Sequence, residues 1–339
     1  MNLKISVIMP IYNAGKYLKN TLDSIINQTI GFENIELILV DDCSTDNSRD
    51  IVEEYSSKYS NIKPIFLEEN TGCPGIPRNI GIENATSDYI MFIDNDDEYL
   101  PEICNTLYNT LISENADIVV CDNIETEGNT VFTFSIDSCR VVRGKEIVYF
   151  DNVYIWNCIF KRSIILDNNI SFIDGIYEDG IFTLEYYLHS KKLVYLNDFV
   201  GYNHISRKNS LSEVTFDLSI EVINSFDIFV KILNDNNCDL TRFFKPDIQG
   251  MIWRATVLGE DGNKEEIKEV LSHLYDFERK INFNGELAIV YKFINFFILH
   301  GNLNIATYIC LFISKLRKFD LILNVYRKVF SNTRSKKVE

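Results

Sequence analysis

Residues 35–42 read IELILVDD, a nearly continuous apolar run that ends in two aspartates. A strand that is apolar on both faces is buried on both sides, so helices must cover both faces of its sheet. Similar short runs occur at 4–12 (KISVIMPIY), 62–68 (IKPIFLE), 88–96 (DYIMFIDND) and 116–122 (ADIVVCD). Amphipathic stretches between them predict helices near 15–28, 46–59, 75–86 and 101–115. This alternation predicts an α/β fold with a doubly wound, mainly parallel, Rossmann-like sheet.

The rest of the chain has a different pattern. Residues 126–212 are looser, with helices expected at 144–151 and 178–190. After Ser212 the sequence becomes helical, and Val222, Phe226, Phe229 and Leu233 recur at helical spacing. We therefore expect one domain over 1–212 and a C-terminal helical region over 213–339.

Composition narrows the classes of function. The chain has 339 residues and a formal charge of -16, which argues against nucleic acid as a partner because a phosphate backbone attracts basic surfaces. The charge is uneven, since residues 287–339 hold nine Lys or Arg against only Asp320 and Glu339. The eight cysteines are scattered without CxxC pairs, and the N-terminus enters a strand without a leader-like segment. These features predict a cytoplasmic protein with reduced thiols.

Polar clusters follow three of the predicted strands. They are Pro10–Asn13, Asp41–Ser44 and Asp94–Asp97. In doubly wound sheets, ligands bind beyond the carboxyl ends of the strands. We expect the three clusters to share one rim of the sheet.

The cluster at 94–97 reads DNDD, in which Asp94 and Asp96 have the DxD spacing. Adjacent carboxylates repel unless a cation or a proton compensates. Hard oxygen ligands suit Mg²⁺ or Mn²⁺, which often take their remaining ligands from phosphates and water. The alternative is a solvated turn whose acids cap a helix beginning near Pro101.

The cluster at 40–48, VDDCSTDNS, places a second acidic pair at a strand end. A carboxylate there can accept the N3 hydrogen of uracil, and Tyr12 supplies an aromatic face for the same base. Capping of the next helix by Ser44 or Asp46 is the alternative, and both roles are compatible.

Four ordered segments together resemble the family 2 glycosyltransferases with a GT-A fold, over about residues 3–212. They are SVIMPIYNAGKYLKNTLDSIINQT, VDDCSTDNS, NTGCPGIPRNIGIENATSDYIMFIDNDD and YEDGIF. The resemblance implies an enzyme of polysaccharide biosynthesis. Such an enzyme moves a sugar from a nucleoside diphosphate donor, usually a UDP-sugar, to a hydroxyl of a glycan or lipid-linked acceptor. The reaction inverts the anomeric carbon with the help of Mn²⁺ or Mg²⁺.

The resemblance also implies roles for individual residues. The expected nucleotide-binding residues are Pro10, Tyr12, Asn13, Asp41, Asp42, Arg78, Asn79, Asp94, Asn95 and Arg207. The expected metal site combines Asp94 and Asp96 with His204. His204, Arg207 and Ser210 could also neutralise the leaving UDP, although His204 and Ser210 fit an ordinary surface loop as well. Two positions depart from the family pattern: Pro77 stands where alanine is usual, and Cys158 where lysine is common.

Glu178 and Asp179 match the family's Glu-Asp pair. The resemblance makes Asp179 the base that takes the acceptor's hydroxyl proton, with Glu178 orienting it or contacting the acceptor. The alternative is an acidic pair that stabilises the N-terminus of the following helix.

The C-terminal segment mixes aromatic, aliphatic and basic residues, as in 292–299, KFINFFIL, and 315–330, KLRKFDLILNVYRKVF. Such a tail either lies on an anionic membrane surface, which would make the protein peripheral on the inner face of the plasma membrane, or packs as an ordinary helical cap. Two other functions stay open, a nucleotidyltransferase-like enzyme and a catalytically silent nucleotide-sugar-binding protein. Against the first, no glycine-rich basic loop follows the first strand; against the second, a silent binder has no need of Asp179.

Overall fold

The computed structural model describes residues 3–127, 130–134, 141–175, 177–207, 216–259 and 263–317. The chain divides into two compact units, with the break between Arg207 and Lys208. The expected domain boundary at 212 lies among residues 208–215, outside the described residues, and stays a prediction.

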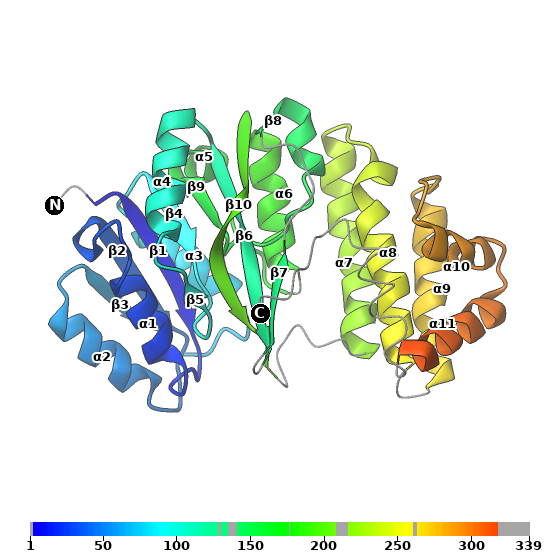
Figure 1. Ribbon diagram of the computed structural model, residues 1–339, viewed down its shortest axis with the longest axis horizontal. Coiled ribbons are helices and arrows are strands. Elements are labelled where there is room, and N and C mark those ends of the chain that lie inside the picture. The colour runs from blue at the N-terminus through cyan, green and yellow to red at the C-terminus, as the bar shows by residue number, and fades with distance from the viewer. Residues whose placement is uncertain are drawn as a thin grey trace. The chain divides into compact units, whose positions relative to one another are not determined.

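The first unit is built on one large sheet (Figure 1). Its strands are ordered β3-β2-β1-β4-β9-β6-β10-β5, with β7 paired to β6 and β8 paired to β10. The strands are β1 (Ile5–Ile11), β2 (Ile35–Asp41), β3 (Ile62–Phe66), β4 (Tyr89–Phe92), β5 (Glu98–Tyr99), β6 (Ile118–Glu127), β7 (Thr130–Phe134), β8 (Val141–Arg143), β9 (Cys158–Lys161) and β10 (Lys192–Ile205).

The half of the sheet that carries the polar clusters is parallel. Strands β3, β2, β1 and β4 run the same way, and β6 is parallel to β10. Strand β9 is inserted antiparallel between β4 and β6, which sequence periodicity did not predict. The mainly parallel sheet is confirmed, with antiparallel additions around this insertion.

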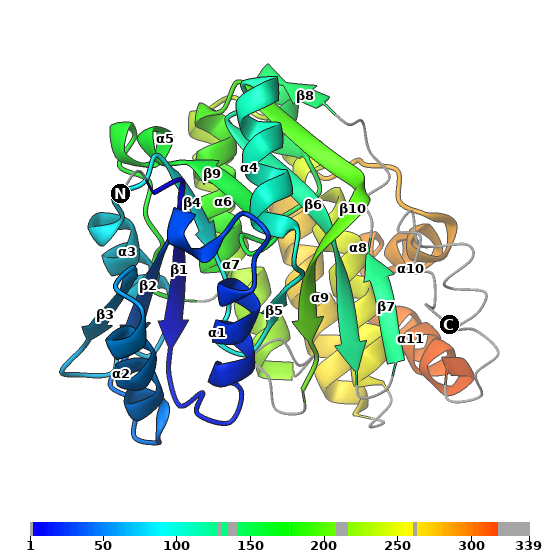
Figure 2. The ribbon, with the colours of Figure 1, turned by 60° about the vertical axis from the view of Figure 1, so that its left-hand side comes forward.

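Helices cover both faces of the sheet, as the buried strands predicted (Figure 2). They are α1 (Leu18–Ile26), η1 (Phe32–Asn34), α2 (Ser48–Lys58), α3 (Gly75–Asn84), α4 (Ile103–Glu114), η2 (Gly144–Tyr149), α5 (Arg162–Asp167) and α6 (Glu178–His189). The segment expected to be helical at 144–151 is the 3₁₀ helix η2. In β2, Leu37 and Leu39 join the core beneath α1, α2 and α4, whereas Ile38 and Val40 join the core beneath α3, α5 and α6.

The second unit is helical. Its described helices are α7 (Phe216–Asp235), α8 (Leu240–Leu258), α9 (Lys264–Lys280), α10 (Ile289–Leu299) and α11 (Leu303–Arg317). The rings of Phe226, Phe244 and Phe277 pack with centroids 4.9 to 5.3 Å apart, tying α7, α8 and α9 together. The predicted inward positions Val222 and Leu233 are buried. Within the described ranges, no helix is long and apolar enough to cross a membrane.

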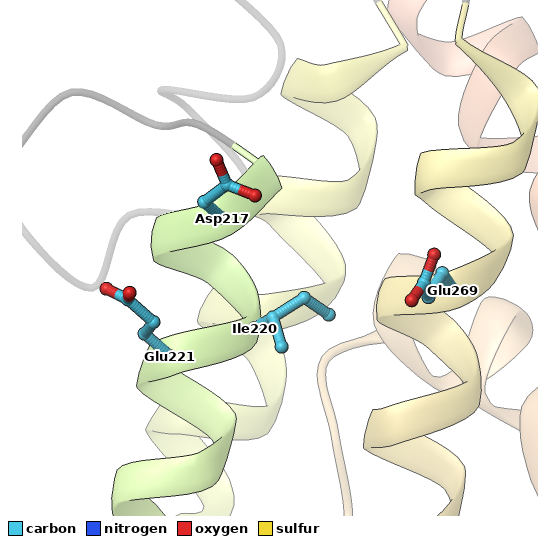
Figure 3. A pocket seen from close by; sticks show the side chains of 4 residues that line it. All are labelled: Asp217, Ile220, Glu221 and Glu269. Atoms are coloured by element: carbon cyan, nitrogen blue, oxygen red, sulfur yellow. The ribbon is translucent and has the colours of Figure 1, made fainter.

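A shallow hollow of about 350 Å³ opens between α7 and α9, lined by Asp217, Ile220, Glu221 and Glu269 (Figure 3). Its polar lining is acidic throughout. Nowhere in the described part of the chain do His, Cys, Asp and Glu side chains gather in a group of three or more that could hold a metal ion. We assign no ligand to this hollow.

Glu36 is a fully buried carboxylate in the strand that opened the sequence analysis. Lys63 from β3 pairs with it, and the Ser6 hydroxyl from β1 donates to it. The amide and the hydroxyl of Thr86 also donate to it, both at 2.8 Å. Burial raises the pKa of Glu36, but these bonds outweigh it, so the pKa lies below its ordinary value of 4.5. The ionised side chain therefore fastens three neighbouring segments.

We predict that Glu36→Gln lowers the free energy of unfolding at pH 7 by about 2 kcal/mol, because charge-assisted bonds are lost from a buried site. The folded-state pKa is depressed, so the stabilisation is present above the unfolded pKa and disappears as the pH falls through the folded pKa. In urea titrations the gap between variant and wild type should narrow below about pH 4.5. The exposed Glu83→Gln is the control, and a gap that stays constant down to acid pH would contradict the prediction.

Candidate active site

The three polar clusters meet at one rim, as their positions at strand ends predicted. The Asn95 amide nitrogen donates to the carbonyl of Pro10 at 3.0 Å, which joins the ends of β4 and β1. The Asn13 side-chain oxygen accepts from the Thr45 amide at 2.8 Å, and the Asn13 amide donates to Ser44 Oγ at 3.0 Å. Asn13 has a left-handed φ of 49°, which asparagine tolerates, and this conformation lets the chain turn back toward β2.

The two aspartates at the end of β2, Asp41 and Asp42, make different contacts. The Asp42 carboxylate accepts from the amide and hydroxyl of Thr71, both at 2.9 Å, and from the Asn70 amide at 3.3 Å. Asp42 thus fastens the loop before α3, a role that sequence reasoning did not predict. Asp41 Oδ2 accepts from the Ser44 amide at 3.3 Å, whereas Asp41 Oδ1 is buried without a hydrogen-bond partner.

The unmet acceptor on Asp41 is the group of this pair best suited to a donor on a ligand, because a buried, unpaired carboxylate oxygen is costly. Tyr12, at the end of the neighbouring strand, is 48% exposed. An exposed ring and an unsatisfied acceptor at adjoining strand ends are the parts that a nucleoside base requires.

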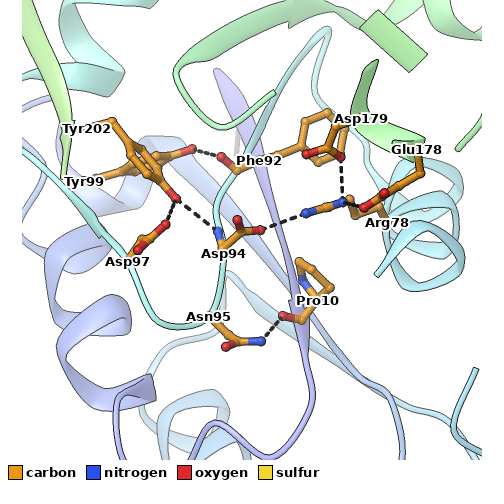
Figure 4. Close-up of polar contacts among 10 residues, drawn as sticks. All are labelled: Pro10, Arg78, Phe92, Asp94, Asn95, Asp97, Tyr99, Glu178, Asp179 and Tyr202. Atoms are coloured by element: carbon orange, nitrogen blue, oxygen red, sulfur yellow. Dashed lines mark hydrogen bonds and ion pairs between the residues drawn. The ribbon is translucent and has the colours of Figure 1, made fainter. Parts of the chain in front are cut away.

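Arg78 lies at the centre of the rim (Figure 4). Its side chain is 3% exposed. Nη2 contacts Asp94 Oδ1 at 2.8 Å, while Nη1 contacts Glu178 Oε1 at 2.9 Å and Asp179 Oδ1 at 2.7 Å. The guanidinium also lies over the Phe172 ring, 5.4 Å from its centroid. One arginine on α3 therefore joins the DxD loop after β4 to the first turn of α6.

The charges around Arg78 do not balance, because three carboxylates share one guanidinium. Burial raises the pKa of Asp179 to about 8; Arg78 opposes this effect, and Glu178 and Asp94 add to it. Burial disfavours the charged form of Arg78, but the pKa of Arg78 is raised overall by the three acids. The site therefore holds a permanent cation beside a carboxyl group whose proton affinity is raised.

Asp96 faces a second arginine. Arg207 bonds to both the carboxylate and the backbone carbonyl of Asp96, and it stacks 3.6 Å from the centre of the Tyr17 ring. Burial raises the pKa of Asp96; Arg207 and His204 lower it, and Asp94 raises it further. Asp96, a predicted metal ligand, and Arg207, a predicted nucleotide-binding residue, thus lie side by side.

Asp97 is a structural residue. It is buried, and it accepts from the Tyr202 hydroxyl and the Ile205 amide, both at 2.8 Å. Burial, together with Asp94, raises the pKa of Asp97 to about 8. The proposed alternative of acids capping the next helix is wrong, because α4 begins after Glu102 without a side-chain cap. Asp97 instead attaches the DxD loop to β10.

Among the described residues, the three predicted metal ligands, Asp94, Asp96 and His204, do not form a group that could hold a metal ion by themselves. The side chains of Asp94 and Asp96 are 34% and 40% exposed on one loop. The ring of His204 is parallel to that of Trp156 at 6.1 Å, and its Nδ1 lies 4.0 Å from Glu125 Oε1. As noted above, no three ligating side chains gather among the described residues. Mg²⁺ and Mn²⁺ sites of one or two carboxylates plus phosphate oxygens need no such group.

Glu178 and Asp179 open α6, preceded by Tyr177 in a left-handed conformation with φ 66°. A side chain other than glycine, asparagine or aspartate is strained there, and such strain often marks a functional turn. The turn directs both acids to Arg78. The helix-terminus alternative also holds, because carboxylates in a first turn are favoured by the helix dipole.

Asn79, predicted to bind the nucleotide, is bonded to the backbone of Phe172. Its side-chain amide donates to the Phe172 carbonyl and its oxygen accepts from the Phe172 amide, both at 2.8 Å. Both polar groups are thus used by the segment that leads to α6. Asn79 therefore positions that segment, and its role in nucleotide binding stays a prediction.

Sequence reasoning missed an aromatic column beside the site. Tyr154 stacks on Trp156 at 4.6 Å, and Trp156 stacks on Tyr202 at 4.2 Å. Tyr154 is 49% exposed, whereas Trp156 and Tyr202 are buried. The Trp in 156–160, WNCIF, was available as a signal, but nothing in the local sequence tells which ring of such a column reaches the surface.

The segment before Trp156 runs along α6. Tyr187 donates to the Asn152 carbonyl at 2.8 Å, and Thr183, one turn nearer Asp179, donates to the Val153 carbonyl at 3.3 Å. The chain therefore approaches the N-terminus of α6 as it reaches Tyr154. Cys158, which stands where the family often has lysine, is buried.

A doubly wound sheet that presents a DxD loop at its carboxyl edge, tied to an acidic pair on a later helix, has the architecture of a GT-A glycosyltransferase. The family model described as glycosyl transferase family 2 matches residues 6–164. The glycosyltransferase GlyG of Streptococcus pneumoniae is 32% identical over 233 residues, covering 65% of this chain and 76% of that protein. This chain belongs to glycosyl transferase family 2.

Two further relatives are informative. A poly(ribitol-phosphate) beta-glucosyltransferase of Bacillus spizizenii is 33% identical over 63% of this chain, but the match spans only 34% of that longer protein. The structure of Staphylococcus aureus TarS 1-349 in complex with UDP-GlcNAc has a TM-score of 0.70 at 24% identity, covering 93% of this chain and 92% of that one. At this identity the likeness establishes the fold.

We predict that Arg78→Gln lowers the free energy of unfolding by about 3 kcal/mol, because it leaves three partly buried carboxylates without their buried cation. Lys19→Gln is the control: Lys19 pairs with Glu54 at 3.2 Å, but its side chain is 53% exposed. Exposed pairs are worth at most about 1 kcal/mol. Urea titration of both variants tests the difference, and equal losses would show that the acids around Arg78 do not depend on it.

Proposed function

We propose that this protein is a metal-dependent, inverting glycosyltransferase that moves a sugar from a UDP-sugar to a hydroxyl of a glycan or lipid-linked acceptor, in the synthesis of a surface polysaccharide. The observation that carries the proposal is the Arg78 cluster. It joins Asp94, in the DxD loop, to Asp179, the candidate base, across one rim. A single displacement needs a leaving-group site and a base held in a fixed relation to each other.

Asp179 suits the role of general base. It is 25% exposed, so an acceptor hydroxyl can reach it, and burial raises its pKa to about 8. A base whose pKa lies near the working pH transfers protons most efficiently. Arg78 fixes the position of Asp179, and Glu178 is held on the same Nη1 atom as an orienting partner.

The donor side of the proposal rests on the opposite end of the rim. Tyr12 and the unpaired Asp41 oxygen would take the base, while Asp96 and Arg207 lie where a diphosphate would follow. Arginine forms strong charge-assisted bonds with phosphate. The UDP-GlcNAc complex of the TarS structure and the sugar-transfer names of the relatives support a UDP-sugar donor.

A divalent cation bound by Asp96 and Asp94 would stabilise the charge that grows on the departing diphosphate. The chain's own residues do the rest: Arg207 neutralises phosphate charge, and Asp179 takes the proton of the attacking hydroxyl. Attack opposite the departing group inverts the anomeric carbon.

On the acceptor side, Tyr154 suits a carbohydrate. Its half-exposed ring stands at the end of the segment that approaches Asp179. A sugar presents an apolar C–H face that packs against an aromatic ring, while its hydroxyls remain available for hydrogen bonds. An acceptor on this side would reach the base from the edge opposite Asp41.

We predict that Asp179→Asn reduces transfer by about 10² to 10⁴-fold, because the acceptor hydroxyl loses its base. UDP-sugar binding should be unchanged, because Asp179 does not contact the donor in this proposal. A thermal-shift panel of nucleotide sugars with Mn²⁺ selects the donor, and UDP release with acceptor measures transfer.

The control for this substitution is Asp174→Asn, an exposed acid in the same segment. Undiminished turnover in Asp179→Asn would remove Asp179 from the base role. A wild-type protein that binds UDP-sugar but transfers nothing to any acceptor would instead be a silent binder. Formation of a nucleotide sugar from a nucleoside triphosphate and a sugar phosphate would favour the nucleotidyltransferase alternative.

We predict that Mn²⁺ tightens UDP binding to the wild type by about tenfold or more, a gain of at least ~1.4 kcal/mol, and that Asp96→Asn abolishes this gain. Isothermal titration of UDP with and without Mn²⁺ measures it without requiring turnover. The exposed Asp50→Asn, on α2, is the control. Identical wild-type titrations with and without metal would contradict the DxD assignment.

A further inference from the structure

Helices α10 and α11, which contact each other, carry an unusual number of exposed apolar side chains. Seven large apolar side chains on these two helices are 41% to 84% exposed: Ile289, Phe293, Phe296, Leu299, Ile305, Tyr308 and Phe312. We call these residues the α10–α11 face. They include more than half of the exposed large apolar residues in the described parts of the chain.

The exposed apolar residues of α10 are additional to the apolar residues that pack inside the unit. In α10, Ile294 and Ile298 are fully buried on the inner side, while Ile289, Phe293 and Phe296 repeat at helical spacing on the outer side. Helix α9 of the same unit differs, because its buried stripe is apolar and its exposed positions are mostly charged. A helix that is apolar all round needs a second apolar environment.

The charge within α10 and α11 is one-sided, although two acids lie nearby: exposed Glu286 precedes α10, and Glu265 interacts with Lys264. Residues 287–319 contain no Asp or Glu, although the whole chain has a formal charge of -16. Lys292 on α10 and Lys315 on α11 are exposed. Lys264 donates to the Tyr308 hydroxyl at 3.0 Å and lies over that ring, which places a third cation at its edge. The face is therefore apolar with a basic border.

We propose that the α10–α11 face docks on an anionic lipid surface. Aromatic and aliphatic side chains enter the boundary between head groups and acyl chains, and basic residues beside them are attracted to anionic head groups. Because no described helix can span a bilayer, contact of this kind would be with the surface of the membrane. The lack of acidic residues within α10 and α11 favours anionic lipid over a second copy of this acidic chain.

The sequence of the C-terminal segment predicted membrane contact as one of two alternatives. Residues 318–339 lie outside the described residues, and six of them are basic against two acidic. The proposal rests on the described helices α10 and α11, and the composition of the tail adds to the same attraction. It requires neither a donor nor turnover, so it succeeds or fails independently of the proposed function.

The test is flotation of the full chain with vesicles of phosphatidylglycerol and phosphatidylcholine in equal parts, or of phosphatidylcholine alone, at low and high salt. We expect binding to the anionic vesicles at low salt, and weaker binding at high salt and to neutral vesicles. Phe293→Ser with Phe312→Ser should reduce the bound fraction at least about tenfold, because apolar burial drives insertion. Lys292→Gln with Lys315→Gln should weaken anionic binding and reduce its salt dependence.

The matched control is Ile228→Ser, which removes a 42% exposed side chain from α7 of the same unit. Thermal unfolding establishes that each variant is folded, and light scattering gives the oligomeric state without lipid. Equal binding by the Phe293, Phe312 double variant and wild type would overturn the proposal, as would absence of binding or equal affinity for neutral vesicles. A wild-type dimer that the double variant converts to monomer, without vesicle binding, would assign the face to self-association instead.

Discussion

The buried ion cluster at Arg78 is the constraint on which the candidate site depends. Removing a guanidinium from water is unfavourable unless charged partners with good geometry surround it. Here the partners come from Asp94, after β4, and from Glu178 and Asp179, at the start of α6. These segments are far apart in sequence, and one buried cation ties them together at the rim.

Around this centre, several acids and amides that look like ligand-binding groups hold the rim together. Asp42 fastens the loop at Thr71, Asp97 fastens the DxD loop to β10, and Asn79 fastens the backbone at Phe172. Buried polar networks of this kind fix positions when every member is satisfied. Asp94, Asp96 and Asp179 differ, because their carboxylates remain partly exposed. That difference separates groups that build the site from groups that can act in it.

Sequence periodicity was sufficient for the first half of the fold. The runs at β1, β2, β3, β4 and β6 have strand length and apolar composition, and their buried faces required helices on both sides. It could not place β9 between β4 and β6, because strand order depends on packing that a local pattern does not carry. Likewise, Glu36 interrupts an apolar strand, and its acceptance depends on Lys63, Ser6 and Thr86 from other segments. The motifs located the site residues, but only the bonding partners distinguish Asp41 from Asp42 and Asp96 from Asp97.

The most direct measurement is the anomeric configuration of the sugar in the product, read from the proton NMR coupling of the anomeric hydrogen after transfer from the donor that binds. In the proposed mechanism, Asp179, one of the three carboxylates paired with Arg78, acts as the base, and no covalent sugar intermediate is required. A single displacement therefore predicts a product with the configuration opposite to that of the donor. Retained configuration would contradict the role of Asp179 and the mechanism built on it.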